Sequence, residues 1–172
     1  MIILMSGDDI RNIADIVGGD KTYRHFVKRI NKEFQIADEE RNTHVYVFYQ
    51  KNKRGKEVGF AVVGHSAAKM KVWEETFKEE GWVDKKYKMA TPCYELMYMY
   101  VRPEEREKGW GGKLFDEVVA FTKEERVRGI YAYVGERVPA ALTFYQQKGA
   151  RMIQNLSGDG VSNAFLEWRI VK

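Results

Sequence analysis

The sequence predicts a mixed α/β fold, in which helices flank a sheet of seven strands. Residues 44–50 and 58–65 are two runs rich in β-branched and aromatic residues, and the polar turn between them is typical of a hairpin. A strand pattern is followed by an amphipathic helix pattern in residues 94–121 and again in residues 130–149. Residues 151–156 and 164–171 predict a final pair of strands joined by a glycine-containing turn.

The first 39 residues predict a short strand and two helices. Residues 2–5 are apolar enough for a strand, and Ser6 with Asp9 forms a capping-box variant that starts a helix. Gly18-Gly19 ends that helix, and we expect Asp20 to cap the next one. The second helix carries an apolar stripe at helical spacing: Tyr23, Phe26, Val27, Ile30 and Phe34.

The later elements follow the same two periodicities. An insert at about residues 66–91 has helical spacing at Met70, Trp73 and Phe77. A helix then follows the glycine-rich turn near residue 110, and another starts near Pro139 and ends at Gly149. In the last strand, Leu166, Trp168 and Ile170 alternate with Glu167, Arg169 and Val171, which predicts a half-buried strand.

Length and charge restrict the function classes. At 172 residues the chain is long enough for one domain with a real core, and we expect residues 1–172 to form it. The formal net charge is +4, from 29 basic and 25 acidic residues that are spread rather than clustered. This balance suits an anionic ligand but argues against nucleic acid as a partner.

Several other classes of protein require residues or segments that this sequence lacks. Cys93 is the only cysteine, which excludes a disulfide framework, and the three histidines have no metal-ligand spacing. The opening MIILMS has no basic flank typical of a signal peptide, and no apolar run approaches the ~18 residues of a membrane span. We therefore expect a cytoplasmic protein with no metal and no membrane partner.

Residues 94–121 carry the strongest functional signal. They predict a strand, a polar loop that ends in Gly109, Gly111 and Gly112, and an amphipathic helix. The first backbone N–H groups of a helix have no intrahelical acceptor, and the helix dipole adds positive potential there. Glycines let a ligand approach these donors closely, and Arg106 adds a fixed positive charge. The segment therefore predicts a site for a phosphate-bearing ligand.

Three phosphate-binding motifs compete for this loop. A Walker loop needs Ser or Thr after Gly-Lys, but Leu114 follows Gly112-Lys113. A dinucleotide fingerprint needs a third glycine at the position that Leu114 occupies. The spacing that fits is R-x-x-G-x-G, from Arg106 to Gly111.

The run ELMYMYVRPEEREKGWGGKLF resembles the strand, Val-x-Pro turn, pyrophosphate loop and helix of the GNAT superfamily of acetyl-CoA-dependent N-acetyltransferases. About 35 residues later, ALTFYQQKGA resembles the second signature of that family, A-x-x-F-Y-x-x-x-G-F. The sequence departs from the family pattern at Val138, where members often carry Asn, and at Ala150, where they carry an aromatic residue. The predicted element order matches the family fold along nearly the whole chain.

The resemblance implies a mostly antiparallel sheet with a V-shaped split between the fourth and fifth strands, in which acetyl-CoA binds. Backbone groups around Met99, Tyr100 and Val101 would hydrogen-bond the pantetheine arm as an added strand does. The pyrophosphate would lie on the backbone amides of the glycine loop, beside Arg106. The loop residues are Lys108, Gly109, Trp110, Gly111 and Gly112, and the side chain of Glu107 should point to solvent.

Two residues are candidates for catalysis. Glu95 lies on the same strand face as Met97 and Met99, where an apolar setting should raise the pKa of a carboxyl group and suit a general base. The alternative is that Glu95 pairs with a structural Arg or Lys. Tyr145 matches the tyrosine of the second signature, which implies a general acid for the departing CoA thiolate. Its alternative is a core tyrosine on an apolar helix face.

The leading hypothesis is an N-acetyltransferase that acts on a primary amine by direct attack. We favour a small-molecule acceptor over a protein N-terminus or a lysine, since the resemblance to family members that modify ribosomal proteins is not close around residues 135–137. The alternative, in which the protein is not an enzyme, is a non-catalytic acyl-CoA-binding regulatory module. The sequence does not identify the acceptor amine or the acyl-chain preference, and family resemblance leaves a homodimer open.

Overall fold

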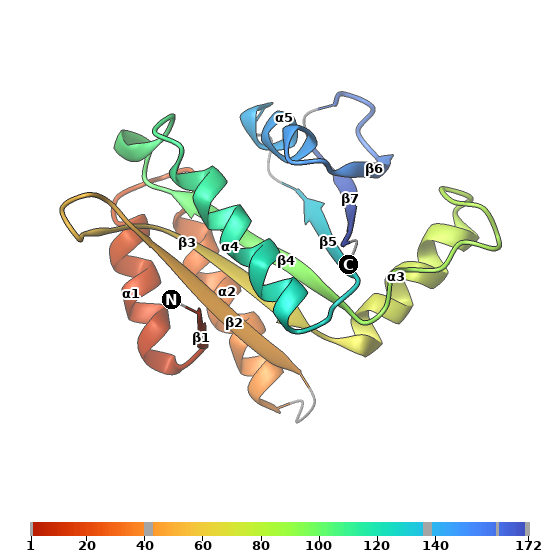
Figure 1. The fold of residues 1–172 in the computed structure, drawn as a ribbon, viewed down its shortest axis with the longest axis horizontal. Coiled ribbons are helices and arrows are strands. Elements are labelled where there is room, and N and C mark those ends of the chain that lie inside the picture. Colours follow the sequence, from red (N-terminus) through yellow and green to blue (C-terminus); the bar gives the residue numbers. More distant parts are fainter. Residues whose placement is uncertain (1, 40–42, 136–138, 161, 171–172) are drawn as a thin grey trace. The chain divides into compact units, whose positions relative to one another are not determined.

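The computed structural model describes residues 2–39, 43–135, 139–160 and 162–170 (Figure 1). Val138 and the neighbouring Glu136 and Arg137 therefore lie outside the described residues. The chain forms two compact units: unit 1 is Met1–His65 with Leu96–Phe121, and unit 2 is Ser66–Glu95 with Thr122–Lys172. The single domain expected from the sequence stays a prediction.

The strand order is β1-β2-β3-β4-β5-β7-β6. The pairs β1–β2, β2–β3, β5–β7 and β6–β7 are antiparallel, whereas β4 and β5 are parallel. This confirms the predicted mixed, mostly antiparallel sheet with flanking helices. The parallel pairing joins Cys93, Tyr94 and Glu95 to Gly129, Ile130 and Tyr131.

Unit 1 contains the N-terminal strands and the helices that flank them. Its first elements are β1 (Ile2–Leu4), α1 (Gly7–Val17), α2 (Arg24–Glu39), β2 (His44–Lys51) and β3 (Glu57–His65). The later elements are most of β4 (Cys93–Val101), the short 3-10 helix η1 (Pro103–Glu105) and the larger part of α4 (Trp110–Glu124). The order matches the sequence prediction.

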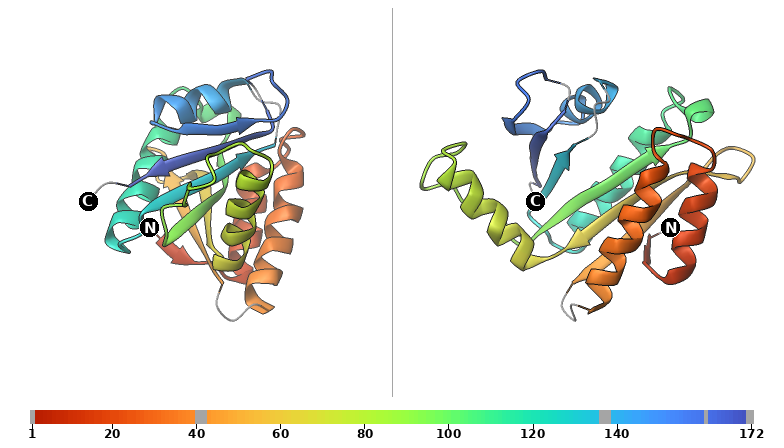
Figure 2. Two further views of the ribbon diagram at one scale, coloured as in Figure 1. Left: turned by 90° about the vertical axis from the view of Figure 1, so that its right-hand side faces the viewer. Right: turned by 180° about the vertical axis from the view of Figure 1, so that it is seen from behind.

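Helices cover both faces of the strands in unit 1. On one face lie α1 and α2 (Figure 2). Their apolar residues pack against alternate β2 side chains such as Val45 and Val47. On the other face, the ring centroid of Phe121, near the end of α4, lies 4.9 Å from that of Tyr46 and 5.5 Å from that of Phe48. This division follows from the two-residue period of a strand.

The predicted helix starts differ in one place. The N–H and hydroxyl of Ser6 both donate to Asp9, and α1 starts at Gly7 as the capping box predicts. The second helix, α2, begins at Arg24 rather than directly after Asp20. A turn intervenes because the carbonyl of Asp20 accepts the N–H groups of Tyr23 and Arg24 at 3.2 and 2.9 Å. The Asp20 carboxylate is therefore used elsewhere, as described below.

Unit 2 contains α3 (Ala67–Glu79), the first residues of β4, β5 (Gly129–Val134), α5 (Pro139–Gln147), β6 (Arg151–Asn155) and β7 (Ala164–Arg169). The predicted helix of the insert is confirmed as α3, and its N-terminal cap is Ser66, which accepts the N–H of Lys69 at 3.3 Å. The ring of Phe165 on β7 lies 5.1 Å from both Trp73 and Phe77, so α3 packs on the strands through aromatic contacts.

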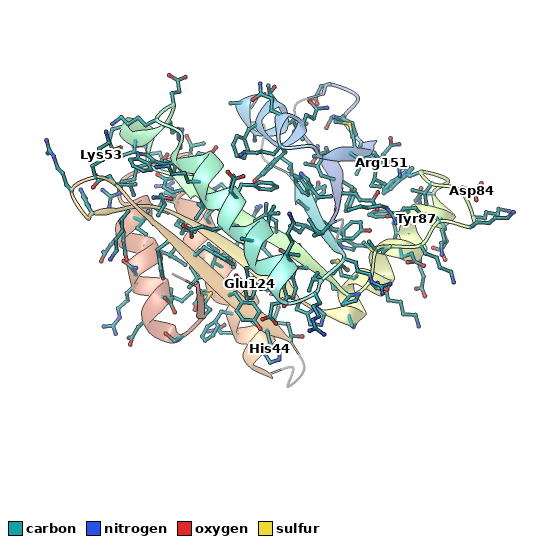
Figure 3. All side chains as sticks on the ribbon, viewed as in Figure 1. His44, Lys53, Asp84, Tyr87, Glu124 and Arg151 are labelled. Atoms are coloured by element: carbon teal, nitrogen blue, oxygen red, sulfur yellow. The ribbon has the colours of Figure 1, made fainter. Side chains whose placement is uncertain are left out.

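The loop from α3 to β4 runs against β5 within unit 2. Asp84 and Tyr87 mark this loop in Figure 3, and the Asp84 carboxylate accepts the N–H of Lys86 at 2.7 Å. Gly129 allows the close approach, because a Cβ there would lie 2.9 Å from the Ala90 carbonyl oxygen. The loop therefore places the start of β4, and Glu95 with it, beside β5.

Candidate functional site

The glycine turn in unit 1 begins α4 as the sequence predicts. Glu107 and Gly109 have positive φ angles of 61° and 82°, so both adopt the left-handed backbone region just before the helix. The first helical bond runs from the Lys113 N–H to the Gly109 carbonyl at 3.1 Å. The amides of Trp110, Gly111 and Gly112 precede it and have no acceptor within the helix. This is the geometry of an anion site.

The side chains of this turn leave the backbone accessible. Glu107 and Lys108 are exposed, and the Lys108 ammonium lies 3.1 Å from the Glu105 carboxylate. A Cβ added to Gly109 would meet nothing within 4 Å among the described residues. The turn thus presents main-chain donors on an open surface, and the exposed Glu107 side chain matches its expected direction.

Arg106 points to the turn between α1 and α2. Its Nε donates to the carbonyl of Val101 at 2.9 Å, and Nη2 lies 3.5 Å from the Asp20 carboxylate. Its guanidinium also lies over the rings of Tyr23 and Tyr100, at 5.3 and 5.7 Å from their centroids. The cation that sequence reasoning placed beside the anion therefore has an acidic partner within unit 1.

The predicted pantetheine segment ends β4. Met99 and Val101 are half-buried, whereas Tyr100 is buried and donates its hydroxyl to Asp20 at 2.8 Å. Burial, reinforced by the hydrogen bond to Asp20, raises the pKa of the Tyr100 phenol well above its ordinary value. The side chain of Tyr100 thus anchors the strand, and any ligand contact at this segment would come from its backbone.

Glu95 in unit 2 is buried, with 9% of its surface exposed, and it pairs with a lysine on α3. The ammonium of Lys69 lies 3.1 Å from one carboxylate oxygen and 2.8 Å from the other. The same ammonium lies 5.7 Å from the centroid of the Trp73 ring. The structure therefore gives Glu95 the lysine partner that the sequence analysis kept as its alternative.

Tyr145 lies on α5, also in unit 2, and is 9% exposed. Its ring meets Trp168 edge to face with centroids 5.5 Å apart, and Trp168 in turn donates its indole N–H to the Lys148 carbonyl at 3.2 Å. The Tyr145 carbonyl accepts the N–H groups of Lys148 and Ala150, at 3.1 and 3.0 Å, where the helix ends. The position of the phenol ring is therefore set by packing on β7.

Comparison with known protein families matches residues 11–150 to the acetyltransferase (GNAT) family. This match spans most of the chain, including the glycine turn and both candidate catalytic residues. The chain belongs to the GNAT acetyltransferase family.

Solved structures agree with this assignment. The GNAT chain is similar to a GNAT-family acetyltransferase from Staphylococcus aureus Mu50, with 16% identity and a TM-score of 0.58 over 99% of both chains. A GNAT-family protein from Desulfovibrio desulfuricans gives 14% identity and a TM-score of 0.63 over 99% of both chains. At such identities these likenesses concern the fold alone.

A third solved structure contains coenzyme A. It is the PaiA N-acetyltransferase from Thermoplasma acidophilum in complex with coenzyme A, with 14% identity and a TM-score of 0.59 over 98% of both chains. Comparison of the GNAT sequence with curated proteins gave no significant match.

Two features bear on membranes and metals. In the described part of this GNAT protein, no helix is both long and apolar enough to cross a bilayer. Within the same residues, no three or more His, Cys, Asp or Glu side chains gather as metal ligands would.

Sequence reasoning missed the residue that braces the glycine turn of this GNAT protein. Glu105 accepts hydrogen bonds from Asn52 at 3.2 Å, Lys108 at 3.1 Å and the indole N–H of Trp110 at 3.3 Å. The Asn52 bond first, and then the Lys108 bond, lower the pKa of the Glu105 carboxyl group. The spacing of Glu105 and Lys108 was visible in the sequence, but Asn52 comes from the β2–β3 hairpin.

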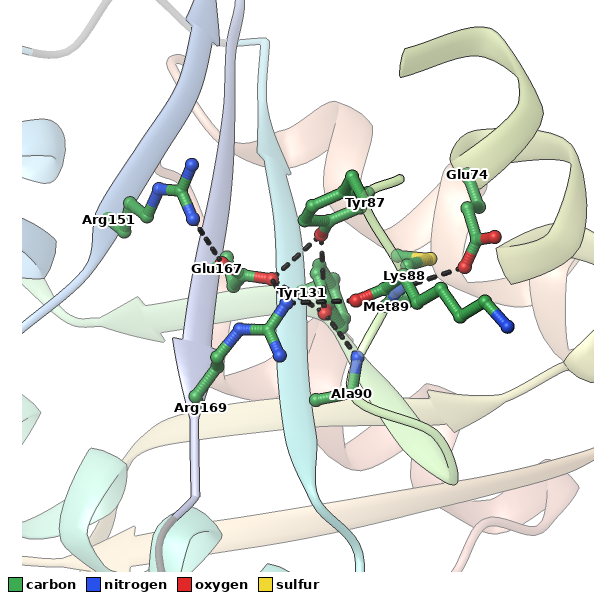
Figure 4. A network of polar contacts seen from close by, with 9 residues as sticks. All are labelled: Glu74, Tyr87, Lys88, Met89, Ala90, Tyr131, Arg151, Glu167 and Arg169. Carbon is green, nitrogen blue, oxygen red and sulfur yellow. Dashed lines mark hydrogen bonds and ion pairs between the residues drawn. The ribbon is translucent and has the colours of Figure 1, made fainter. Parts of the chain in front are cut away.

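Glu167 is the second missed residue, and it overturns the reading of β7 as a strand with one polar side. Its side chain is 1% exposed, and it accepts the hydroxyls of Tyr87 and Tyr131 at 2.7 and 2.8 Å (Figure 4). Arg169 and Arg151 lie 3.2 and 3.4 Å from its oxygens. Burial of this carboxylate is tolerated because two arginines balance its charge and two tyrosine hydroxyls donate hydrogen bonds to it.

The Glu167 network holds the loop that leads to Glu95. The Tyr131 hydroxyl accepts the Ala90 N–H at 2.8 Å, and Arg169 donates to the Lys88 carbonyl at 2.9 Å (Figure 4). Tyr131 is also the strand partner of Glu95 in the parallel β4–β5 pairing. The network therefore holds the loop that precedes the candidate base and the β5 residue that pairs with it.

Proposed function

We propose that this GNAT acetyltransferase moves an acetyl group from acetyl-CoA to a primary amine of a small molecule by direct attack. The observation that carries the proposal is the glycine turn, where three successive backbone amides precede the first hydrogen bond of α4. Family membership and the coenzyme A complex of a structural relative support the same acyl donor.

The residues present fit acetyl-CoA. The open space at Gly109 and its positive φ would let a pyrophosphate approach the backbone, as the amides from Lys108 to Gly112 would require. Backbone groups from Met99 to Val101 would hold the pantetheine arm. When bound, acetyl-CoA supplies a thioester whose carbonyl carbon is open to an amine.

Glu95 is our candidate for the group that removes a proton from the acceptor. Alkyl amines have a pKa of ~10.4 and are mostly protonated near neutral pH, so a base increases the attacking fraction. Lys69 contacts both Glu95 oxygens, but each oxygen of a carboxylate has a second lone pair that can accept a proton directly or through water. In this proposal Lys69 holds the carboxylate in place.

Tyr145 is our candidate for the proton donor to the departing thiolate. Packing against Trp168 holds its ring, and its match to the family tyrosine supports the role. A phenol of pKa ~10 protonates a thiolate by close placement rather than by driving force, because the thiol pKa is ~8.5. The proposal therefore depends on the phenol reaching the sulfur.

A non-catalytic acyl-CoA-binding module is the second candidate. The ion pair between Lys69 and Glu95 favours it, because it offers a purely structural reason for a buried carboxylate. The two candidates bind the same cofactor and differ in turnover. For either one we infer a cytoplasmic location, which the single, buried Cys93 supports.

The first experiment compares the melting temperature of the protein with acetyl-CoA, CoA, ATP and NAD at equal concentrations. A ligand at ~100 times its Kd adds ~2.7 kcal/mol of stability, which is easily measured. A shift with the two CoA species alone supports the acyl-donor site, and thiol release with a panel of amines then separates enzyme from binding module. If neither CoA species shifts the melting temperature, the proposed function is wrong.

A further inference from the structure

We infer that Asp20 is a positioning residue for the acyl donor and that it acts through Arg106. This inference rests on the proposed acetyl-CoA site. Asp20 lies between α1 and α2, far from the glycine turn in sequence, but both belong to unit 1. The carboxylate would hold the arginine, and the arginine would hold the start of the phosphate-binding turn.

Three donors surround the Asp20 carboxylate, whose side chain is only 11% exposed. Oδ2 accepts the Tyr100 hydroxyl at 2.8 Å and lies 3.5 Å from Nη2 of Arg106. Oδ1 accepts the Thr22 N–H at 3.1 Å. A carboxylate this enclosed is built into the structure rather than left on the surface as a chance charge.

The Arg106 guanidinium is held on several sides. The Val101 carbonyl receives its Nε at 2.9 Å, and the Tyr23 and Tyr100 rings lie within 5.7 Å of it. The arginine thereby joins the end of β4 to the start of the turn. A planar guanidinium can make these contacts at the same time, which a lysine ammonium cannot.

A second arginine connects the same parts of unit 1. Nη2 of Arg102 donates to the Asp15 carbonyl at 2.7 Å, and the backbone N–H of Arg102 donates to the Val58 carbonyl at 2.8 Å. The segment between β4 and the glycine turn is thus tied to the end of α1 by Arg102 and to the α1–α2 turn by Arg106. A turn that is held before binding loses less conformational entropy when the phosphate binds.

The opposite arrangement is that Arg106 leaves Asp20 to pair with the phosphate. Asp20 would then compete with the ligand, and its removal would strengthen CoA binding. The observations favour positioning, since the Val101 carbonyl and the two rings hold Arg106 in the same place as Asp20 does. The two arrangements predict effects of opposite sign.

The test is calorimetric titration of CoA into wild type and Asp20→Asn. We expect the variant to bind CoA about fivefold more weakly, the effect of losing about 1 kcal/mol. Asp15→Asn is the matched control, because it removes the same charge from an exposed side chain near the end of α1 and leaves the carbonyl that Arg102 uses. We expect wild-type affinity for this control.

A ligand without the pyrophosphate separates positioning from general damage. Turnover of S-acetylpantetheine should change little in Asp20→Asn, whereas KM for acetyl-CoA should rise. A second variant, Arg106→Lys, tests the same inference if Asp20→Asn does not fold. The lysine keeps the positive charge but lacks the planar, forked guanidinium. If Arg106 acts by positioning the turn, this variant should therefore bind CoA more weakly.

Unchanged or tighter CoA binding by Asp20→Asn would overturn the inference, as would wild-type affinity in Arg106→Lys. Equal losses with acetyl-CoA and S-acetylpantetheine would overturn it as well, because the effect would not act through the pyrophosphate. If wild type itself does not bind CoA, it is the proposed function that fails.

Discussion

Lys69 and Glu95 form an ion pair in unit 2, with one ammonium within 3.1 Å of both oxygens of a buried carboxylate. The lysine comes from α3 and the glutamate from β4, so the pair joins the insert to the strand that carries the candidate base. The pair either prepares the carboxylate for catalysis or replaces that role with a structural one. Turnover distinguishes the two.

Glu95→Gln should lower kcat by about 100-fold or more, because a positioned general base contributes about 10²–10⁴ to the rate. The amide keeps the shape of the side chain but cannot take a proton. Lys69→Met should lower kcat less, since Glu95 remains, and Lys71→Met on the exposed face of α3 is the control. Full kcat in Glu95→Gln from mildly acidic to mildly basic pH would rule out the base.

Tyr145→Phe should lower kcat, again by about 100-fold, with the Kd of acetyl-CoA nearly unchanged. The ring that packs on Trp168 remains, so only the hydroxyl is lost. Phe144→Leu, at the next position on α5, reports the effect of altered packing without loss of a proton donor. Equal losses of kcat and affinity in Tyr145→Phe would assign it a binding or packing role.

Gly109→Ala should weaken CoA binding about tenfold, because displacing one amide from a charged acceptor costs about 1.5–3 kcal/mol. Its φ of 82° also strains any residue with a Cβ, by about 1–2 kcal/mol. Gly158→Ala is a matched control with a φ of 65° in an exposed turn of unit 2. Stability should fall in both variants, and CoA affinity in Gly109→Ala alone. The same affinity in the two variants would contradict the phosphate site.

Tyr131→Phe should reduce the free energy of unfolding by about 2 kcal/mol in urea titrations. The change leaves the Ala90 N–H without its acceptor and removes one donor from Glu167. Tyr133→Phe lies two residues along the same strand, where the hydroxyl of an exposed tyrosine donates to Asn163, and should cost under about 0.5 kcal/mol. If Tyr131→Phe lowered the free energy of unfolding by as little as Tyr133→Phe does, the Glu167 network would contribute little to stability.

Cys93 should resist alkylation in the folded protein well above neutral pH. Burial, reinforced by the charge of Glu74, raises the pKa of its thiol from 9.0 to about 12. Since the folded pKa is the higher one, its contribution to stability is complete below the unfolded pKa and is lost as pH rises towards 12. Mass spectrometry after iodoacetamide treatment at pH 8 checks this, with urea-unfolded protein as the positive control. Rapid labelling of the folded protein would contradict it.

Local patterns predicted the elements and the glycine turn well. The capping box of Ser6 and Asp9 and the start of α4 next to Gly109 depend on residues a few positions apart, whose backbone preferences are intrinsic. Predictions were poorer where a local pattern had a distant competitor. Asp20 looked like a helix cap, but its carboxylate also meets Tyr100, 80 residues away.

Glu167 shows the same limit in a strand. Alternation placed it with the polar residues of β7, and nothing nearby in the sequence indicates that Tyr87, 80 residues away, would bury it. A carboxylate can be buried only when donors surround it, and those donors come from elements that meet through sheet pairing.

The sequence by itself determined the order of strands and helices, the position of the glycine turn and the family resemblance, because each depends on short-range patterns of residues. Only the tertiary structure decided which charged side chains pair: Lys69 with Glu95, and Arg106 with Asp20. Such pairs depend on long-range packing that brings distant segments within about 3–4 Å, the distance at which ions and hydrogen bonds act. The chemistry of Glu95 and Arg106 is therefore set by partners that no local motif contains.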